Sequence, residues 1–142
     1  LINTNLNSAF FVARAVIPAM KARRSGKIIN ICSVLSLIAR PNIVPYAASK
    51  GGLAMFTKGV AVELAAHNIQ VNGIAPGFYK TEMNTALFTN PEFDAWVCKR
   101  TPAARWGEPE ELVGAAVFLA STASNYVSGQ IVCVDGGFTS AM

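Results

Sequence analysis

The six residues KIINIC, at positions 27–32, form a short apolar run rich in β-branched side chains. Such a run, in which polar and apolar positions do not alternate, is typical of a strand buried on both faces of a parallel sheet. Two further runs of this kind follow, IQVNGIA at 69–75 and GQIVCVDGG at 129–137. The run at 69–75 ends at Pro76-Gly77, which is a strong turn signal. The sequence therefore predicts three buried strands.

Helical patterns separate these strands. Apolar side chains recur with a helical period through residues 1–24, and residues 46–67 form a long segment rich in Ala, Leu and Met. Residues 107–121 open with acidic side chains and Pro109, which are helix-start signals. The resulting order, α-β-α-β-α-β, predicts an α/β fold in which helices cover both faces of a doubly wound parallel sheet.

Residues 78–103 do not fit this alternation. Short helical patterns are interrupted there by Asn90-Pro91 and Thr101-Pro102, pairs that favour turns. We therefore expect a mobile segment rather than a part of the core.

Composition excludes several classes of protein. The chain has 142 residues, about one domain's worth, and 52% of them are hydrophobic, which predicts a buried core. No apolar run reaches the roughly 18 residues that span a bilayer, so we expect no membrane segment. The three cysteines are odd in number and form no CxxC pair, which disfavours both a disulfide framework and a zinc site. We expect no metal, and a reduced, cytoplasmic protein.

The net charge of +4 is concentrated in MKARRSGK at 20–27. A nucleic-acid patch is one interpretation. The alternative is a set of cations in the last turn of a helix, where they complement the helix dipole before a glycine stop. Because no aromatic residues are interleaved there for base stacking, we favour the helix end and expect no nucleic-acid partner.

Tyr46 and Lys50 lie four residues apart where a helix begins, so their side chains share one face. That face points toward the carboxyl end of the neighbouring strand, where open α/β sheets bind ligands. A nearby cation lowers the pKa of a phenol, about 10 when free, toward the range useful for proton transfer. Ser33 follows the first strand, and its hydroxyl can stabilise charge on a substrate oxygen. Ser36 is an alternative hydroxyl, and each of these residues alone also has a purely structural interpretation.

Ser33, Tyr46 thirteen residues later and Lys50 together resemble the Ser/Tyr/Lys centre of the short-chain dehydrogenase/reductase family. The resemblance extends through VNGIAPGFYKTEM at 71–83 and VDGG at 134–137, and it covers the whole chain. It implies four catalytic residues: Asn5, Ser33, Tyr46 and Lys50, with Asn5 holding a water in the proton relay. It also implies a cofactor-binding set: Tyr46, Lys50, Pro76, Gly77, Tyr79 and Thr81.

The family resemblance implies an oxidoreductase that interconverts a ketone and a secondary alcohol with NADP or NAD. VELAAHNIQVNGIAPGFYKTEM at 62–83 and CKRTPAARWGEPEEL at 98–112 are similar to members that interconvert 5-keto-D-gluconate and D-gluconate, often with NADP(H). A sugar-acid or polyol substrate is therefore expected, with residues 78–100 closing over it. Arg100 and Lys99 are candidates for binding the acid's carboxylate, whereas Arg105 is expected to pair with Glu110 or Glu111.

Family members also carry a TGxxxGxG phosphate loop and an NNAG motif, neither of which occurs in these 142 residues. The resemblance thus implies that residues 1–142 form the carboxyl-terminal part of a single Rossmann-type domain, without its amino-terminal dinucleotide loop. This second half would contain three strands, three main helices and a short helical substrate loop. In this family the helix matching 46–67 commonly pairs subunits, which implies a homo-oligomer, a tetramer or a dimer. Two alternatives remain: an inactive fragment that serves only in association, or a reductase of another polyol or ketoacyl substrate.

Overall fold

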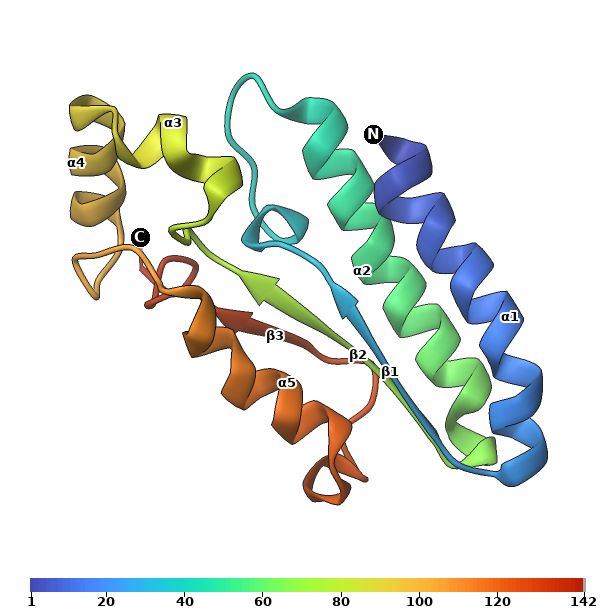
Figure 1. Cartoon of the computed structure of the whole chain (residues 1–142). Coiled ribbons are helices and arrows are strands. Elements are labelled where there is room, and N and C mark those ends of the chain that lie inside the picture. The colour runs from blue at the N-terminus through green and yellow to red at the C-terminus, as the bar shows by residue number, and fades with distance from the viewer. Residues whose placement is uncertain (142) are drawn as a thin grey trace.

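A computed structural model describes residues 1–141 of the chain (Figure 1). Its helices and strands follow the predicted alternation, with two short helices inserted after the second strand. In chain order they are the π-helical turn η1 (Asn3–Asn7), α1 (Ser8–Arg23), β1 (Gly26–Ile31), α2 (Val44–Leu64), β2 (Ile69–Pro76), α3 (Thr85–Phe88), α4 (Pro91–Arg100), α5 (Val113–Ala120) and β3 (Ile131–Val134).

The three strands form one parallel sheet in the order β1-β2-β3. Gly26 lies opposite Ile69 across the first pair, and Gly73 lies opposite Ile131 across the second. Helices α1 and α2 run side by side over one face of the sheet, and α5 covers the other (Figure 1). The prediction of a doubly wound, Rossmann-like parallel sheet is therefore confirmed.

The main core lies between α2 and the sheet. Every residue of β2 from position 69 to 75 is buried, as expected for a central strand with helices on both faces. Two apolar clusters fill the space. The first contains Cys32, Leu53, Ala54 and Ala75, and the second contains Ala61, Leu64, Ile69 and Val71.

Two elements are shorter than their sequence patterns predict. The segment 107–121 begins as a 3-10 turn, η5 (Pro109–Leu112), and only then becomes α5. The strand predicted at 129–137 is confined to β3, because Gly136 and Gly137 adopt positive φ angles of 62° and 87° and turn the chain away from the sheet.

The expectation that residues 78–103 lie outside the core is wrong. Val97 of α4 is fully buried, and Trp106, which follows the segment, is 2% exposed. Six side chains gather here into what we call the aromatic cluster, with ring centroids 5.2–6.2 Å apart in the contacting pairs: Phe78, Phe88, Phe93, Trp96, Trp106 and Phe138. This cluster forms a second, smaller core beside the carboxyl ends of the strands.

The basic run at 20–27 lies at a helix end, as the favoured interpretation predicts. Lys21 and Arg23 are in the last turn of α1. The helix stops at Arg24, whose φ of 52° is left-handed, rather than at the predicted glycine. The Arg24 guanidinium donates a hydrogen bond to the carbonyl oxygen of Ala66 (3.0 Å), so it ties the end of α1 to the turn that follows α2.

Candidate active site

The loops that leave β1 and β2 at their carboxyl ends, together with the start of α2, surround a cavity of about 480 Å³. Open α/β sheets bind ligands at this edge. All eight residues that the sequence predicted for the site lie on the cavity wall: Asn5, Ser33, Tyr46, Lys50, Pro76, Gly77, Tyr79 and Thr81. Segments up to 76 residues apart in the chain, from Asn5 to Thr81, thus meet in one place.

Ser33 is buried directly beyond β1, where the chain turns into the 3-10 turn η2 (Val34–Ser36). Its side-chain oxygen accepts a hydrogen bond from the backbone N–H of Leu35 (3.1 Å), which fixes its position as the cap of that turn. Ser36, the alternative hydroxyl, donates instead to the carbonyl oxygen of Lys50 (2.8 Å) and does not lie on the cavity wall. Of the two serines, Ser33 therefore faces the cavity.

Tyr46 and Lys50 occupy the first two turns of α2, which begins at Val44 with Pro45 at its amino end. The Lys50 ammonium donates to the carbonyl oxygen of Ile31 (2.7 Å) and lies 5.9 Å from the centroid of the Tyr46 ring. Partial burial of the ammonium lowers the pKa of Lys50. The last residue of β1 thus holds the cation beside the phenol.

Asn5 reaches the site from η1, a single π-helical turn before α1. Such turns are frequent at functional sites. The Asn5 side-chain amide donates to the hydroxyl of Ser49 (3.1 Å), which in turn donates to the carbonyl oxygen of Tyr46 (2.7 Å). Ser49 is fully buried and links Asn5 to the turn of α2 that carries Tyr46. Sequence reasoning missed Ser49, although its position between Tyr46 and Lys50 was a usable signal.

The loop after β2 is held closely against β3. A side chain at Gly77 would place a Cβ atom 2.8 Å from the Cα atom of Asp135, so only glycine fits without moving backbone. The Tyr79 hydroxyl donates to the carbonyl oxygen of Val134 (2.9 Å), and burial raises the pKa of Tyr79. Tyr79 therefore forms cavity wall while its hydroxyl is used to join this loop to β3.

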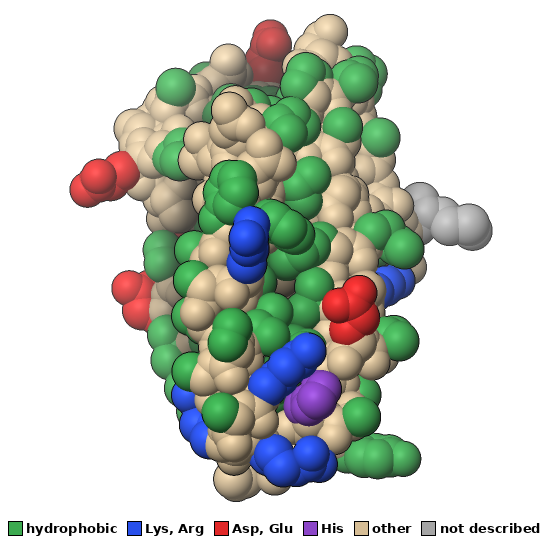
Figure 2. All heavy atoms as spheres, turned by 90° about the vertical axis from the view of Figure 1, so that its right-hand side faces the viewer, with side chains coloured by type: hydrophobic (Ala, Val, Ile, Leu, Met, Phe, Trp, Pro, Cys, Tyr) green, Lys and Arg blue, Asp and Glu red, His purple; other side chains and the backbone are tan. Residues whose placement is uncertain are grey.

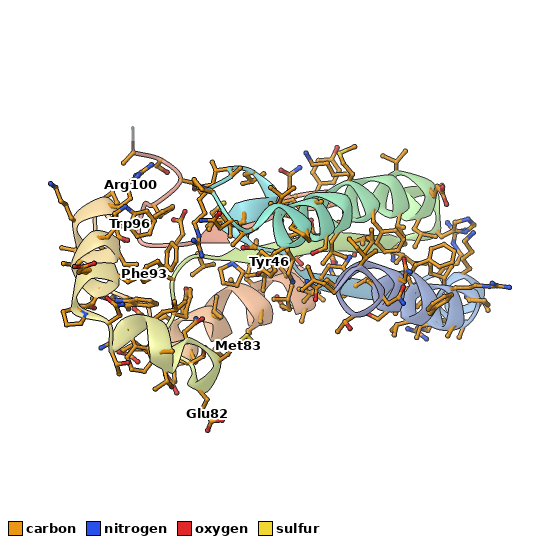
Figure 3. All side chains as sticks on the ribbon, turned by 90° about the horizontal axis from the view of Figure 1, so that it is seen from above. Tyr46, Glu82, Met83, Phe93, Trp96 and Arg100 are labelled. Carbon is orange, nitrogen blue, oxygen red and sulfur yellow. The ribbon has the colours of Figure 1, made fainter. Side chains whose placement is uncertain are left out.

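A second cavity, of about 340 Å³, shares Ser33, Tyr46 and Gly77 with the first. It extends along the loop before α2 and includes Arg40. Figure 3 shows Tyr46 at the start of α2, with Met83 from η4 (Glu82–Asn84) and the labelled α4 side chains on the side of the site away from α1.

The charged residues expected near the substrate take other positions. The Arg100 guanidinium donates to the carbonyl oxygens of Phe138 (3.2 Å) and Ala141 (3.0 Å), and Lys99 is exposed. Neither lies on the wall of a cavity that contains Tyr46, so the carboxylate role expected for them is not supported. The predicted pair of Arg105 with Glu111 is confirmed at 2.7 Å. Arg40 was overlooked, although it is a lone cation in an apolar loop between Ser33 and Tyr46.

Among residues 1–141, no three His, Cys, Asp or Glu side chains come together in a way that could hold a metal ion. Within the same range, no helix is both long enough and apolar enough to cross a bilayer.

Comparison with known proteins agrees with this geometry. Residues 1–139 match the model of a short-chain dehydrogenase family described as Enoyl-(Acyl carrier protein) reductase. The whole chain is 57% identical to 5-keto-D-gluconate 5-reductase of Escherichia coli (strain K12) and spans 56% of that protein. It is 55% identical to gluconate 5-dehydrogenase of Gluconobacter oxydans, with 98% of this chain and 54% of that protein covered.

A solved structure with the same fold is that of a gluconate 5-dehydrogenase from Burkholderia cenocepacia in complex with NADP and tartrate. It superimposes with a TM-score of 0.98 at 56% identity, over 100% of this chain and 56% of that one. The chain thus spans little more than half the length of the relatives it matches. The parallel sheet and the cavity lined by the predicted residues agree with the family model that the chain matches. From this match it follows that the chain belongs to the short-chain dehydrogenase/reductase family.

Proposed function

We propose that this chain is the catalytic portion of an NADP-dependent oxidoreductase that interconverts 5-keto-D-gluconate and D-gluconate. The observation that carries the proposal is the single cavity whose wall contains Asn5, Ser33, Tyr46 and Lys50. The sugar acid is supported by the names of relatives at 55–57% identity, and NADP by its presence in the related Burkholderia structure. In this proposal, residues 1–142 are the carboxyl-terminal part of one Rossmann-type domain.

The residues present fit the nicotinamide end of a dinucleotide. An ammonium has three N–H donors, and the Ile31 carbonyl takes one from Lys50, so others remain for the ribose hydroxyls. The cavity of about 480 Å³ lies in the range of roughly 300–1,000 Å³ usual for small-ligand sites. Tyr46, Lys50 and the loop from Pro76 to Thr81 would hold this end of the cofactor. When bound, the cofactor supplies or accepts the hydride.

The proton chemistry belongs to the side chains of this chain. In the reductive direction, Tyr46 donates its phenolic proton to the substrate oxygen as the carbon–oxygen double bond becomes a single bond. Ser33 donates a hydrogen bond to the same oxygen and stabilises its developing negative charge. Lys50, held by the Ile31 carbonyl, stabilises the phenolate that remains. Asn5 orients the water that returns a proton toward Tyr46 by way of Lys50.

The change Tyr46→Phe tests the catalytic assignment in the full-length protein. Loss of a general acid costs roughly 10²- to 10⁴-fold in rate, so we expect turnover of 5-keto-D-gluconate to fall by at least about 100-fold. The matched control is Tyr126→Phe, because Tyr126 is fully exposed and lies outside both cavities. Near-normal turnover by the Tyr46→Phe variant would remove the basis of the proposal.

Substrate and cofactor are tested by direct comparison. The full-length protein should reduce 5-keto-D-gluconate with NADPH, and more slowly an acetoacetyl thioester. A preference for the thioester would assign the protein to ketoacyl reduction instead. Titration of NADPH and NADH against the 142-residue chain and the full-length protein, followed by nicotinamide fluorescence, tests the association-module alternative. Binding by the full-length protein without binding by the 142-residue chain would favour that alternative for these 142 residues.

We further propose that the protein is a cytoplasmic homo-oligomer, a tetramer or a dimer. Support comes from the outer face of α2, where a stripe of small and apolar residues, exposed except for the half-buried Gly51, runs along the helix: Ala48, Gly51, Met55, Gly59 and Val62. Figure 2 shows this side of the molecule, with apolar side chains over much of its surface and most of the Lys and Arg side chains toward its lower end.

A further inference from the structure

Arg40 lies in the loop between η2 and α2, and its position is unusual in one respect. Its Nε atom is the single buried side-chain nitrogen or oxygen atom among residues 1–141 that has no hydrogen-bond partner. Buried polar groups in folded proteins are nearly always paired, and an exception calls for an explanation such as an absent ligand. The guanidinium also forms no ion pair with a carboxylate of the described residues. Its charge is therefore not compensated within this part of the chain.

The surroundings of Arg40 place this charge beside the proposed catalytic groups. Arg40 lines the cavity of about 340 Å³ that also contains Ser33 and Tyr46. Among the described residues on that wall, Arg40 alone carries a charge. Its guanidinium carbon lies 5.8 Å from the centroid of the Phe93 ring, a contact that restricts the position of the guanidinium without using its N–H donors.

We propose that Arg40 binds the carboxylate of the substrate and thereby selects keto acids over neutral ketones. A guanidinium binds a carboxylate through two parallel N–H···O bonds, and the unpaired Nε–H is one donor suited to such a pair. A six-carbon keto acid has its carboxylate and its carbon 5 near opposite ends, so one cavity can place the ketone at Ser33 and Tyr46 and the acid at Arg40. This inference rests on the proposed function and deepens it by naming the residue that binds the substrate carboxylate.

The other cations near the site are less suited to this role. The Arg100 guanidinium is already bonded to two backbone carbonyl oxygens and lies 4.8 Å from the Phe138 ring. Arg105 is paired with Glu111 through two bonds of 2.7 Å. Lys50 is bonded to the Ile31 carbonyl, and its remaining donors are those assigned above to the ribose hydroxyls. Arg40 differs from Arg100 and Arg105 because its Nε is buried without a hydrogen-bond partner.

The test compares Arg40→Gln and Arg40→Lys in the full-length protein, with Lys99→Gln as a control at an exposed cation. Two substrates are matched: 5-keto-D-gluconate and the neutral 5-keto-D-fructose. Loss of a charge-assisted pair corresponds to roughly a 10- to 100-fold change in equilibrium constant. We expect Arg40→Gln to raise KM for the acid by about that factor and to leave KM for the neutral ketone unchanged. Arg40→Lys keeps the positive charge but not the two parallel N–H donors, so its KM for the acid should lie between those of the wild type and Arg40→Gln.

A binding measurement provides a second readout that does not depend on turnover. Trp96 and Trp106 lie in the aromatic cluster next to this cavity, so their fluorescence can report ligand binding. D-gluconate should perturb the fluorescence of the wild type and D-glucitol, which lacks the carboxylate, should not. In Arg40→Gln, the response to D-gluconate should shift to roughly 10- to 100-fold higher concentration.

The outcomes separate this inference from the proposed function. If the wild type reduces 5-keto-D-gluconate and Arg40→Gln has the same KM, the inference is overturned and the proposed function stands. If the wild type reduces no keto sugar acid, the proposed function fails, and the fluorescence titration still decides whether Arg40 binds a carboxylate. If Arg40→Gln weakens the acid and the neutral ketone equally, or if Arg40→Lys fails to fold, Arg40 is a structural residue and the inference is overturned.

Discussion

Thr57 is the residue whose hydroxyl holds the buried polar side chain of β1 in place. Its hydroxyl oxygen accepts a hydrogen bond from the Asn30 amide (2.9 Å), and its O–H donates to the carbonyl oxygen of Leu53 one turn earlier (2.8 Å). Thr57 is fully buried and Asn30 is 9% exposed. If either side chain lost its partner, water would therefore not readily take that partner's place. The pair therefore fixes α2 against β1 about three turns beyond Tyr46.

We predict that Thr57→Val lowers the free energy of unfolding by about 1–3 kcal/mol, because a donor of Asn30 is left buried and unpaired. Valine has nearly the volume of threonine, so cavity formation contributes little. Thr57→Ser, which keeps the hydroxyl, should retain most of the polar contact. The measurement is the urea midpoint at constant m-value. A loss of stability in Thr57→Ser with none in Thr57→Val would mean that the methyl group, and not the hydrogen bond, matters.

Spacing predicted some residues of the site and could not predict others. Ser33, Tyr46 and Lys50 follow from local rules, because a strand end and the first turns of a helix place side chains in known directions. Arg40 does not follow from local rules. Its guanidinium stands out because no carboxylate pairs with it, and such a carboxylate could have come from any part of the chain. Arg100 was a plausible carboxylate ligand by sequence, but its carbonyl partners lie 38 and 41 residues away.

At the scale of elements, the start of α5 is held by a charged clamp. Glu111 in η5 accepts two hydrogen bonds from Arg105 (2.7 Å each) and one from the backbone N–H of Glu108 (2.8 Å). These bonds lower the pKa of Glu111 from 4.5 to about 2, and the hydrogen bond with Arg105 makes the largest contribution. The clamp joins the loop from α4 to the first turn before α5, next to the wall that carries Tyr79.

The lowered pKa predicts a pH dependence with a definite sign. A carboxyl group whose pKa is lower in the folded protein than in the unfolded chain stabilises the fold. This stabilisation is complete when the pH is above the pKa in the unfolded chain, and it is lost as the pH falls through the pKa in the folded protein. The difference in thermal midpoint between the wild type and Glu111→Gln should therefore be largest above pH 4.5 and shrink as the pH falls to about 2. Arg105→Gln should show the same trend. A difference that does not change with pH would show that the clamp contributes nothing through its charge.

The alternation of strands and helices was predictable from the sequence, but the packing of residues 78–103 was not. Buried strands and amphipathic helices have periods that a sequence displays directly. The aromatic cluster has none, because its members come from β2's exit, α3, α4, the following loop and the segment after β3. Prolines at positions 91 and 102 indicated breaks correctly, yet the breaks separate short helices that pack together rather than a segment without a core.

At the scale of the whole molecule, the outer face of α2 is a surface without a partner among residues 1–141. Met55 is 66% exposed and Val62 is 80% exposed. Gly51 and Gly59 flank Met55 one turn away on either side, and a Cβ atom at either glycine would meet nothing within 4 Å. Glycine inside a helix costs about 1 kcal/mol relative to alanine, and nothing among the described residues requires that cost at these positions. Close approach by the α2 helix of a second copy would account for both glycines.

We therefore predict that Met55→Asp weakens self-association of the full-length protein, because it places an unpaired charge in an apolar contact. Sedimentation velocity should show a smaller assembly, whereas the control Tyr126→Asp, at a fully exposed position away from α2, should leave the assembly intact. Gly59→Ala provides the sharper distinction. If α2 faces solvent, the alanine raises the thermal midpoint by improving helix propensity. If α2 packs closely against a second copy, the added methyl group separates the helices and weakens the assembly instead, and an unchanged mass with a higher midpoint would refute the proposed interface.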